Sequence, residues 1–556
     1  MIPVRYTSQE FEKLSKEGYF GQPAIGVLEE NAEKYPDKQA LVDSKTRLTY
    51  GQIKQKSERL ALSFIEIGLQ KDERVVIQVP NIVEYFIIRS ALGKAGLIGL
   101  YAMLYLREKE MEFACRGTEA SAIIIIPEFH NFNYFNMFQQ MRSKLPNLRH
   151  IFVVGDVVPE GAISITEMMN RPADEKRYGE LFPKTMIKPG EVLELKMTSG
   201  TTGLPKLTEQ YQHGTRLEIG SNSTSDDLES KYGVVHEDIF AALAPLTGGA
   251  SGGAICKGVA LRQGCKVVML ERFDTEEALK LIEREKITFG TGVPTMMAKM
   301  IRHPDFDKYD LSSMRVFHTA GAYLPPALAK EFEEKVGCRV VNHYGASDIG
   351  FATSNRVDDP LEVRLSSVGK PSQGVTLRLI DDDGNDVPQG QVGEILWSTQ
   401  RKGISYYRDL EATLSRESQG LTRTGDLGKL DENGNLYIVG RKKDMIIRGG
   451  QNIFPAEIES ILITHPKILN VAVVSMPDPV MGEKACAFVV PRSGKTLTFD
   501  EMVSFMLEKK CAKYKLPERL EIVDSFPMSG DDQKIMKREL TEMVKAKLAE
   551  ESSTDV

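Results

Sequence analysis

Residues 197–206 read Met-Thr-Ser-Gly-Thr-Thr-Gly-Leu-Pro-Lys and combine the residue types that bind a polyphosphate. Glycine permits positive φ values and a close approach of the backbone, hydroxyl groups donate hydrogen bonds, and lysine supplies a point charge. The loop is not a Walker loop, because Pro205 and Leu207 replace that motif's second glycine and its Ser or Thr. We expect phosphate contacts from Thr198, Ser199, Gly200, Thr201, Thr202, Gly203 and Lys206.

Further motifs follow this loop in order. They read His-Tyr-Gly-Ala-Ser-Asp at 343–348, Thr-Gly-Asp at 424–426, Gly-Arg-Lys-Lys-Asp at 440–444, Gly-Gly-Gln-Asn-Ile-Phe-Pro-Ala-Glu-Ile-Glu at 449–459 and Gln-Lys-Ile at 533–535. In this order and at these intervals, the set resembles the acyl-adenylate-forming (AMP-binding) superfamily, from about residue 25 to about residue 545. Stretches 71–157 and 465–545 are most similar to its stand-alone aryl-acid adenylating enzymes.

The resemblance implies that a carboxylate attacks the α-phosphate of ATP and expels pyrophosphate. Two anions must then meet, so the site needs concentrated positive charge. Lys206 is the implied charge of the phosphate loop, and Asp348 is the implied catalytic ligand of Mg²⁺. Asp348 stands where the family usually has glutamate, which is one methylene longer, and Ser347 replaces threonine while keeping the hydroxyl for the α-phosphate.

The nucleotide contacts implied by the resemblance come from several separate segments. Tyr344 is expected to stack on adenine and Asp426 to accept both ribose hydroxyls, a task that suits a carboxylate. Arg441 is expected to reach the ribose or the phosphates. The remaining expected contacts of the nucleotide are Gly321, Ala322, Asn342 and Gly345.

The C-terminal part supplies the implied catalytic cation, Lys534, which would touch both the attacking carboxylate and an α-phosphate oxygen. Gln533 replaces the glycine that usually precedes this lysine. Lys443 matches the family's hinge position, about which the small domain is expected to rotate after adenylation. That rotation would withdraw Lys534 and bring Gly449 and Gly450 to line a tunnel for the pantetheine arm of CoA. The alternative is a linker without catalytic motion.

The expected acyl pocket lies at residues 245–253, Pro-Leu-Thr-Gly-Gly-Ala-Ser-Gly-Gly. In the aryl-acid relatives a His-Asn pair reads the hydroxyl of the acid, and Gly248 and Gly249 stand at those two places here. The missing amide argues against an enzyme specific for salicylate or dihydroxybenzoate. We expect a broad apolar pocket lined by Gly248, Gly249 and Ala250, with Tyr323 as another wall.

The pattern of elements predicts a mixed α/β protein. Strand candidates at 74–79, 122–126, 150–154, 266–270, 315–318 and 339–342 alternate with helical patterns at 82–92, 275–285 and 326–335, which favours doubly wound parallel sheets. A small antiparallel β subdomain is expected at about 370–440. We place residues 1–442 in an N-terminal domain and 443–556 in a mobile α+β domain, with helices at 455–464, 499–511 and 535–548 and strands at 471–476 and 485–490.

Composition excludes several other classes of protein. The chain has 556 residues, which exceeds what one core usually supports. Its net charge of −7 argues against a general nucleic-acid binder. Its six cysteines form no paired motif, which disfavours a disulfide or zinc framework. The most apolar stretch, 91–106, contains Lys94 and is too short to span a bilayer, so we expect a cytoplasmic protein.

The leading interpretation is an AMP-forming acid–CoA ligase that uses ATP, Mg²⁺ and CoA. Its acid is an alicyclic or aromatic ring acid or one of medium chain length, and the reaction is able to run toward ATP. Three alternatives stay open: an enzyme that loads a carrier protein, an adenylate-oxidising enzyme of the luciferase type, and a non-catalytic acyl-AMP-binding protein. The acid, the acceptor and the oligomeric state, including a homodimer, are not determined by the sequence.

Overall fold

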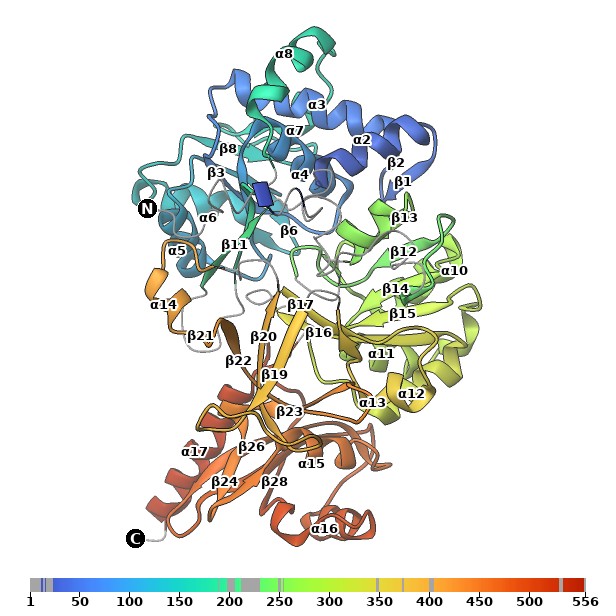
Figure 1. Cartoon of the computed structure of the whole chain (residues 1–556), viewed down its shortest axis with the longest axis vertical. Coiled ribbons are helices and arrows are strands. Elements are labelled where there is room, and N and C mark those ends of the chain that lie inside the picture. Colours follow the sequence, from blue (N-terminus) through green and yellow to red (C-terminus); the bar gives the residue numbers. More distant parts are fainter. Residues whose placement is uncertain are drawn as a thin grey trace.

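The computed structural model describes residues 12–13, 16, 24–188, 190–197, 206–211, 231–248, 252–253, 255–346, 350–372, 375–399, 405–529 and 534–554. Two large sheets, a β subdomain and a C-terminal α+β region follow one another along the chain (Figure 1). None of the described helices is both long enough and apolar enough to cross a bilayer.

The larger sheet has nine strands, and its centre is parallel. At one edge β17 and β18 pair antiparallel with their neighbours, and at the other edge β2 does the same. Across the sheet the order is β18 (Lys370–Pro371), β17 (Gly350–Ser354), β16 (Arg339–Ala346), β15 (Val316–Thr319), β14 (Phe289–Gly292), β12 (Ile239–Ala242), β13 (Lys266–Met269), β1 (Gln39–Val42) and β2 (Arg47–Thr49).

The second sheet has seven strands and is parallel except for β11. Its order is β11 (Leu207–Tyr211), β10 (Val192–Met197), β4 (Ile98–Tyr101), β3 (Arg74–Gln78), β5 (Ala122–Ile125), β8 (His150–Val153) and β9 (Ile163–Ser164). Helices of the two-sheet region are α2 (Ala24–Lys34), α3 (Tyr50–Glu66), α4 (Val83–Ala95), α5 (Glu108–Thr118), α6 (Tyr134–Met141), α7 (Ile165–Met169), α8 (Glu175–Thr185), α10 (Thr275–Glu285), α11 (Pro294–Ile301), α12 (Pro326–Val336) and α13 (Leu361–Ser366).

Helix α4 joins the two sheets. Nearly every residue of it is buried, and its Tyr85 and Ile88 share one hydrophobic cluster with Val75 of β3 and Phe240 of β12. A helix that is apolar all round has no face for solvent and belongs between two layers. Lys94, the one charged residue in its last turn, is buried and pairs with Glu29 at 2.6 Å.

The β subdomain consists of β19 (Val375–Ile380), β20 (Gly393–Thr399), β21 (Glu417–Ser418), β22 (Leu421–Leu430) and β23 (Leu436–Arg441). Strands β19 and β20 pair antiparallel, as do β22 and β23. The expected antiparallel β subdomain is therefore confirmed. The short helix α14 (Leu410–Leu414) precedes β21.

The C-terminal region forms its own sheet of β25 (Gln451–Ile453), β24 (Ile446–Arg448), β27 (Gly482–Pro491) and β26 (Ile468–Asp478), with β28 (Arg519–Ile522) parallel to β27. Helices α15 (Pro455–Leu462), α16 (Phe499–Glu508) and α17 (Lys537–Thr554) complete it below the β subdomain (Figure 1). The predicted fold class is confirmed. Several helix boundaries differ from the expected ones. Helix α15 ends at Leu462, α16 ends before Lys510, which has φ +59, and α17 begins later, because Lys534 and Ile535 form a strand, and runs on to Thr554.

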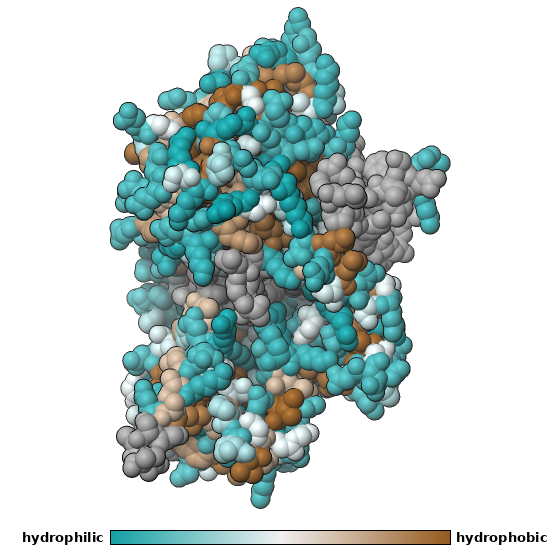
Figure 2. Space-filling model, turned by 90° about the vertical axis from the view of Figure 1, so that its left-hand side faces the viewer, coloured by the Kyte–Doolittle hydropathy of each residue, from teal (hydrophilic) through white to brown (hydrophobic). Residues whose placement is uncertain are grey.

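Figure 2 shows that hydrophilic side chains cover most of one face of the molecule and that hydrophobic side chains appear there in small separate patches.

Two buried histidines lie side by side on neighbouring strands of the nine-stranded sheet. His318 on β15 and His343 on β16 have ring centroids 4.5 Å apart and share a hydrogen bond between Nε2 and Nδ1. Burial lowers the pKa of His318 to about 3, and burial together with His318 lowers the pKa of His343 well below its usual value. Both rings are thus neutral in the folded protein, while in the unfolded chain they gain protons below pH ~6.5.

Stability is therefore expected to fall as pH drops below ~6.5, by about 1.4 kcal/mol per histidine between pH ~7.5 and ~5.5. His318→Asn removes one of these groups and should reduce the loss of thermal stability over that interval. Thermal unfolding at both pH values measures it, with the exposed His130→Asn as control. An equal loss in His318→Asn and in the parent protein would contradict this prediction.

Candidate functional site

The predicted phosphate loop connects two paired strands. Strand β10 leads into it and β11 leaves it, and the two pair antiparallel with Met197 opposite Leu207. Residues 198–205 lie outside the described residues. Lys206 is exposed, and its Nζ lies 4.4 Å from the ring centroid of Tyr406. The second strand is held by segment 405–407, because Tyr407 N donates to Leu207 O at 2.8 Å. Both ends of the loop are thus anchored at the edge of the seven-stranded sheet.

Tyr344 and Asp426 meet although they belong to different sheets. The Tyr344 hydroxyl donates to Asp426 Oδ2 at 2.6 Å, and Arg441 Nε lies 3.1 Å from the other oxygen, Oδ1. Asp426 on β22 stands opposite Arg441 on β23 in the hairpin register, which brings the ion pair together. The three predicted nucleotide contacts are therefore one connected group.

The surroundings keep the Asp426 carboxylate in place. The backbone N–H of Asp426 donates to Thr424 Oγ1 at 3.0 Å, and Thr424 Oγ1 donates to Ile395 O at 2.8 Å. Gly425 between them has φ +73, a conformation that favours glycine. Burial, and then the nearby Asp426 carboxylate, raise the pKa of Tyr344 well above its usual value. Tyr344 therefore stays a neutral donor. Each carboxylate oxygen has two lone pairs, so both can still accept a ribose hydroxyl.

The carboxyl ends of β14, β15 and β16 form one edge. Gly292, Thr319 and Asn342 are neighbours across these strands in the register. Gly321, with φ +83, and Ala322 are exposed in the loop that follows β15. Crevices at the carboxyl ends of parallel strands are where open α/β sheets bind ligands. Gly345 lies three residues beyond the last residue of β16 that pairs with β15, at a register shift against β17.

Thr319 was not predicted as a site residue. Its side chain is fully buried, and Oγ1 has no hydrogen-bond partner among the described residues. Leaving a buried hydroxyl unsatisfied is unfavourable, so a ligand group at this edge would find a donor here. A hydroxyl residue that ends a buried strand is the sequence signal that would have identified it.

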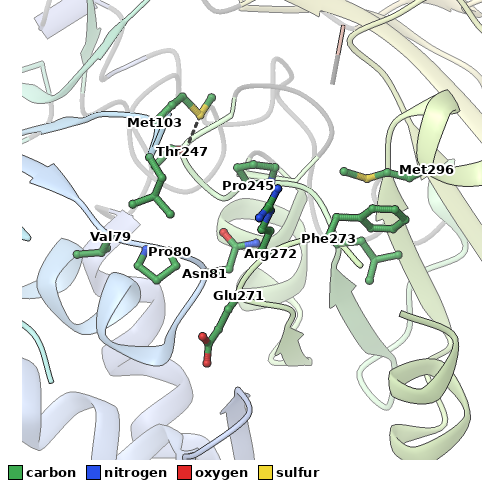
Figure 3. Close-up of a pocket in the computed structure, with 12 residues that line it drawn as sticks. Val79, Pro80, Asn81, Met103, Pro245, Thr247, Glu271, Arg272, Phe273 and Met296 are labelled. Carbon is green, nitrogen blue, oxygen red and sulfur yellow. Dashed lines mark hydrogen bonds between the residues drawn. The ribbon is translucent and has the colours of Figure 1, made fainter. Parts of the chain in front are cut away.

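The described pocket opens beside residues 245–248. Its walls come from strand ends of both large sheets and from α11, and Figure 3 shows Met103 and Thr247 joined by a hydrogen bond on one side with Phe273 and Met296 on the other. It is lined by Val79, Pro80, Asn81, Met103, Leu104, Leu243, Pro245, Thr247, Glu271, Arg272, Phe273 and Met296. Gly248 lies next to it, since a methyl group on Gly248 would be 3.7 Å from Met103 Cε. Gly249 and Ala250 lie outside the described residues.

Asn81 holds the pocket segment in place. Its Oδ1 accepts from Leu246 N at 2.8 Å and its Nδ2 donates to Ala244 O at 3.0 Å. On the other side of the pocket, Gln78 Nε2 donates to Met103 O and Leu106 O. Neither amide was singled out from the sequence, because a lone Asn or Gln after a strand carries no specific pattern.

A buried group of charged side chains lies on the face of the seven-stranded sheet that packs on α4. Glu194 of β10 accepts from Arg89 Nε of α4 at 3.1 Å. Lys196 Nζ lies 3.5 Å and Lys257 Nζ 3.8 Å from Glu194 Oε1. The side chains of Glu194 and Lys257 are each only 6% exposed, so this ion network is shielded from water. We refer to Arg89, Glu194, Lys196 and Lys257 as the Glu194 cluster.

Electrostatics hold the Glu194 cluster together. Burial alone would raise the pKa of Glu194, but Lys257, Arg89 and Lys196 hold it well below its usual range. Burial lowers the pKa of Lys196, and Lys257 and Arg89 add to that effect while Glu194 opposes it. Breaking a buried ion pair on one side costs about 3–5 kcal/mol, whereas each buried methylene contributes only about 0.8 kcal/mol. About four to six buried methylenes would therefore be needed to offset one broken ion pair.

The C-terminal region carries its predicted residues on hairpins. Gly449 and Gly450, with φ +53 and +84, form the two-residue turn between β24 and β25. Lys534 on β30 (Lys534–Ile535) pairs with Ser529 on β29 (Met528–Ser529), and its side chain lies outside the described residues. Lys443 is exposed and lies two residues after Arg441, the last residue of the β subdomain.

Tyr323 is 39% exposed and lies beside Ser460 and Glu459 of α15. It is not among the residues that line the pocket, so its assignment to the acyl wall stays a prediction. Ser347 and Asp348 lie outside the described residues, and the part of the chain that is described contains no group of three or more metal-binding side chains.

Comparison with known proteins finds family matches over most of the chain. The family model of the AMP-binding enzyme matches residues 28–407, and that of the AMP-binding enzyme C-terminal domain matches residues 457–532. The chain is 31% identical to the 2,3-dihydroxybenzoate-AMP ligase of Bacillus subtilis, covering 97% of this chain and 96% of that protein. It is also 31% identical to the mitochondrial medium-chain acyl-CoA ligase of Danio rerio, covering 93% and 88%.

Among solved structures, the anthranilate CoA ligase AuaEII in complex with anthranoyl-AMP is similar, with a TM-score of 0.84 and 25% identity, covering 96% of this chain and 98% of that one. ATP-bound MatB from Rhodopseudomonas palustris is similar too, with a TM-score of 0.80 and 26% identity over 94% and 99%. The matched models cover both the two-sheet region and the smaller C-terminal region. On these matches and on the order of its motifs, this chain belongs to the AMP-binding enzyme family.

Proposed function

We propose that this chain is an AMP-forming acid–CoA ligase. A carboxylate oxygen of the acid attacks the α-phosphorus of ATP, the bond to the β-phosphate breaks, and pyrophosphate leaves. The thiolate of CoA then attacks the acyl carbon and AMP leaves. The observation that carries the proposal is the connected contact of Tyr344, Asp426 and Arg441, because it assembles a nucleotide site from motifs that are far apart in the sequence.

Each step has residues assigned to it. Tyr344, Asn342 and the loop of Gly321 and Ala322 surround adenine, and Asp426 accepts the ribose hydroxyls with Arg441 beside it. The loop at 198–206 holds the phosphates by backbone N–H groups, hydroxyls and Lys206. Asp348 would hold Mg²⁺, which would supply positive charge against the phosphates as the carboxylate approaches. Lys534 neutralises the charge that two meeting anions concentrate.

The second half of the reaction needs a different arrangement. We assign residues 1–442 to an N-terminal domain and residues 443–556 to a mobile one, with Lys443 as the hinge. The support is the position of Lys443 directly after β23, where the β subdomain ends. Rotation there would exchange the Lys534 hairpin for the turn of Gly449 and Gly450, which has no side chains to obstruct a pantetheine arm.

A second candidate transfers the acyl group to a carrier protein. Its support is the identity with the 2,3-dihydroxybenzoate-AMP ligase. The glycines at 248 and 249, in place of a hydroxyl-reading pair, disfavour the acids that such enzymes use.

The decisive assay is carboxylate-dependent exchange of labelled pyrophosphate into ATP over a panel of ring and straight-chain acids. Exchange with at least one acid, followed by saturable thioester formation when CoA is titrated, is the expected result. Exchange without thioester would favour the carrier-protein alternative. No exchange with any acid would contradict adenylation itself.

Lys534→Ala should lower the exchange rate by about 10²- to 10³-fold, because one electrostatic contact to the transition state is lost. ATP binding, measured by equilibrium dialysis, should persist. Lys545→Ala on the exposed side of α17 is the matched control, since it removes the same charge at a position away from the β29–β30 hairpin. Normal exchange in Lys534→Ala would show that another cation has this role.

Asp426→Asn should weaken ATP binding about 10- to 100-fold, the expected effect of losing a charged hydrogen-bond acceptor. Asp382→Asn, which changes an exposed aspartate of the same subdomain, should leave ATP affinity unchanged. Isothermal titration with ATP measures both variants. Equal affinity in Asp426→Asn and the parent protein would remove Asp426 from the ribose site.

A further inference from the structure

Two side chains of the two-sheet region contact the C-terminal region. Arg302, the residue that follows α11, donates from Nη1 to the backbone oxygen of Leu469 on β26 at 2.9 Å. Tyr323, in the loop after β15, has its hydroxyl in hydrogen-bond contact with the Ser460 side chain of α15. Because these contacts involve different elements on both sides of the border, together they fix an orientation of the C-terminal region.

Tyr323 is the donor in its contact with Ser460. The Ser460 hydroxyl donates its one hydrogen to Glu457 O at 2.7 Å, which leaves the lone pairs of Ser460 to accept from a second group. Burial is the main cause that raises the pKa of Tyr323, so the phenol keeps its proton. Tyr323 is still 39% exposed, so α15 can leave it without opening a hydrophobic core.

The residue beside Ser460 leads from α15 to the predicted catalytic lysine. Glu459 Oε1 accepts from Val473 N of β26 at 2.6 Å and lies 2.6 Å from Lys537 Nζ. Lys537 is the first residue of α17 and follows Lys534 by three positions, at most about 11 Å of chain. Glu459 therefore ties the strand of Lys534 to the helix that contacts Tyr323.

The other end of this connection is the expected nucleotide site. Tyr323 directly follows Gly321 and Ala322, the loop expected beside adenine. Helix α15 also packs against β23, which pairs with the strand of Asp426, β22. Figure 1 shows the C-terminus at the end of the molecule far from the two large sheets, so α17 begins at its nearer end. The Lys534 strand is thus on the side of the C-terminal region that is docked toward the nucleotide group.

Two features oppose this docking. Arg302 is near Arg492, which follows β27 in the C-terminal region, and burial and then Arg492 lower the pKa of Arg302. Arg302 Nε is buried without a hydrogen-bond partner among the described residues. Like charges and an unsatisfied donor both raise the energy of the docked state. The hydrogen bonds across the border therefore hold an orientation that is inexpensive to leave.

We propose that Tyr323 is a positioning residue for the adenylation step and not a wall of the acyl site. By donating to Ser460, it docks α15 beside the nucleotide loop. Through Glu459 and Lys537, this docking holds the Lys534 strand toward the phosphates. The inference rests on the proposed function and adds to it the contact that favours the first half-reaction over the second.

The first test is a double-mutant cycle of Tyr323→Phe and Ser460→Ala, measured by pyrophosphate exchange with the acid that gives the highest rate in the panel. Each single variant should lower kcat about 3- to 10-fold, the effect of one hydrogen bond on the docked population. The double variant should lose no more than either single one, because both remove the same contact. KM for ATP and for the acid should stay unchanged. Tyr437→Phe is the matched control, since its hydroxyl donates within the β subdomain to Asp431.

The second half-reaction separates positioning from general damage. With the synthetic acyl-AMP of the same acid and CoA, both single variants should form thioester at least as fast as the parent protein. A loss equal to that of exchange would overturn the inference. Additive losses in the cycle, or a changed KM for the acid in Tyr323→Phe alone, would overturn it as well and return Tyr323 to the acyl wall.

A third test needs no acid. Tyr323→Cys combined with Ser460→Cys should be crosslinked by a short bismaleimide, in a Cys511→Ser background because Cys511 is the one cysteine of the six that is not buried. The control pair is Tyr323→Cys with Val480→Cys. Val480 is 86% exposed and lies beyond the other end of β26, about 30 Å along the strand from Leu469.

The crosslinks distinguish the two hypotheses. Crosslinking that is no more frequent in the Ser460 pair than in the Val480 pair would overturn the docking contact, whatever the substrate is. Frequent crosslinking of the Ser460 pair, together with no exchange by the parent protein with any acid, would instead contradict the proposed function.

Discussion

The hydrogen bond between Tyr344 and Asp426 is the contact on which the site depends, because it connects two sheets that are built separately. Tyr344 lies on β16, the third strand from one edge of the nine-stranded sheet, and Asp426 lies on β22 in the middle of the β subdomain. Tyr344 also packs beside Trp397 of β20, with centroids 6.4 Å apart. If the subdomain docked differently, the ribose and adenine contacts would belong to different surfaces.

The net charge of the chain is −7, so any positive charge that binds a polyanionic ligand has to be concentrated locally. The structure places its cations in two different environments. At the phosphate loop and at Arg441 the cations stay exposed, where they are available to a ligand. In the Glu194 cluster the cations are buried around one carboxylate, where they keep each other and the surrounding segment in place. Burial thus distinguishes the exposed cations of the proposed ligand site from the cations of the Glu194 cluster.

The C-terminal region presents its proposed functional residues on hairpins, with Gly449 and Gly450 in a turn and Lys534 on a strand, while its core is formed by separate hydrophobic clusters of its own. In the proposed function, one hairpin replaces the other by rotation of the whole region, without unfolding either hairpin. Such a rotation needs only a short segment to absorb the change in backbone angles, and we propose the segment after β23 for that role.

Local pattern in the sequence determined the elements that have strong signals of their own. The helix at Thr275–Glu285 and the hairpins of the β subdomain were predictable because periodicity, capping residues and turn glycines act within a few residues. The ordered motifs also predicted the nucleotide group, since Tyr344, Asp426 and Arg441 each lie in a recognisable stretch. Only the tertiary structure decided that Asp426 bridges Tyr344 and Arg441, that Asn81 clamps the pocket segment, and that Tyr323 lies beside α15. The same holds for Arg89, Glu194, Lys196 and Lys257, which read as unrelated charges along the chain. They meet because α4 is held between two sheets, and contacts across such layers depend on packing of distant segments, not on any local pattern.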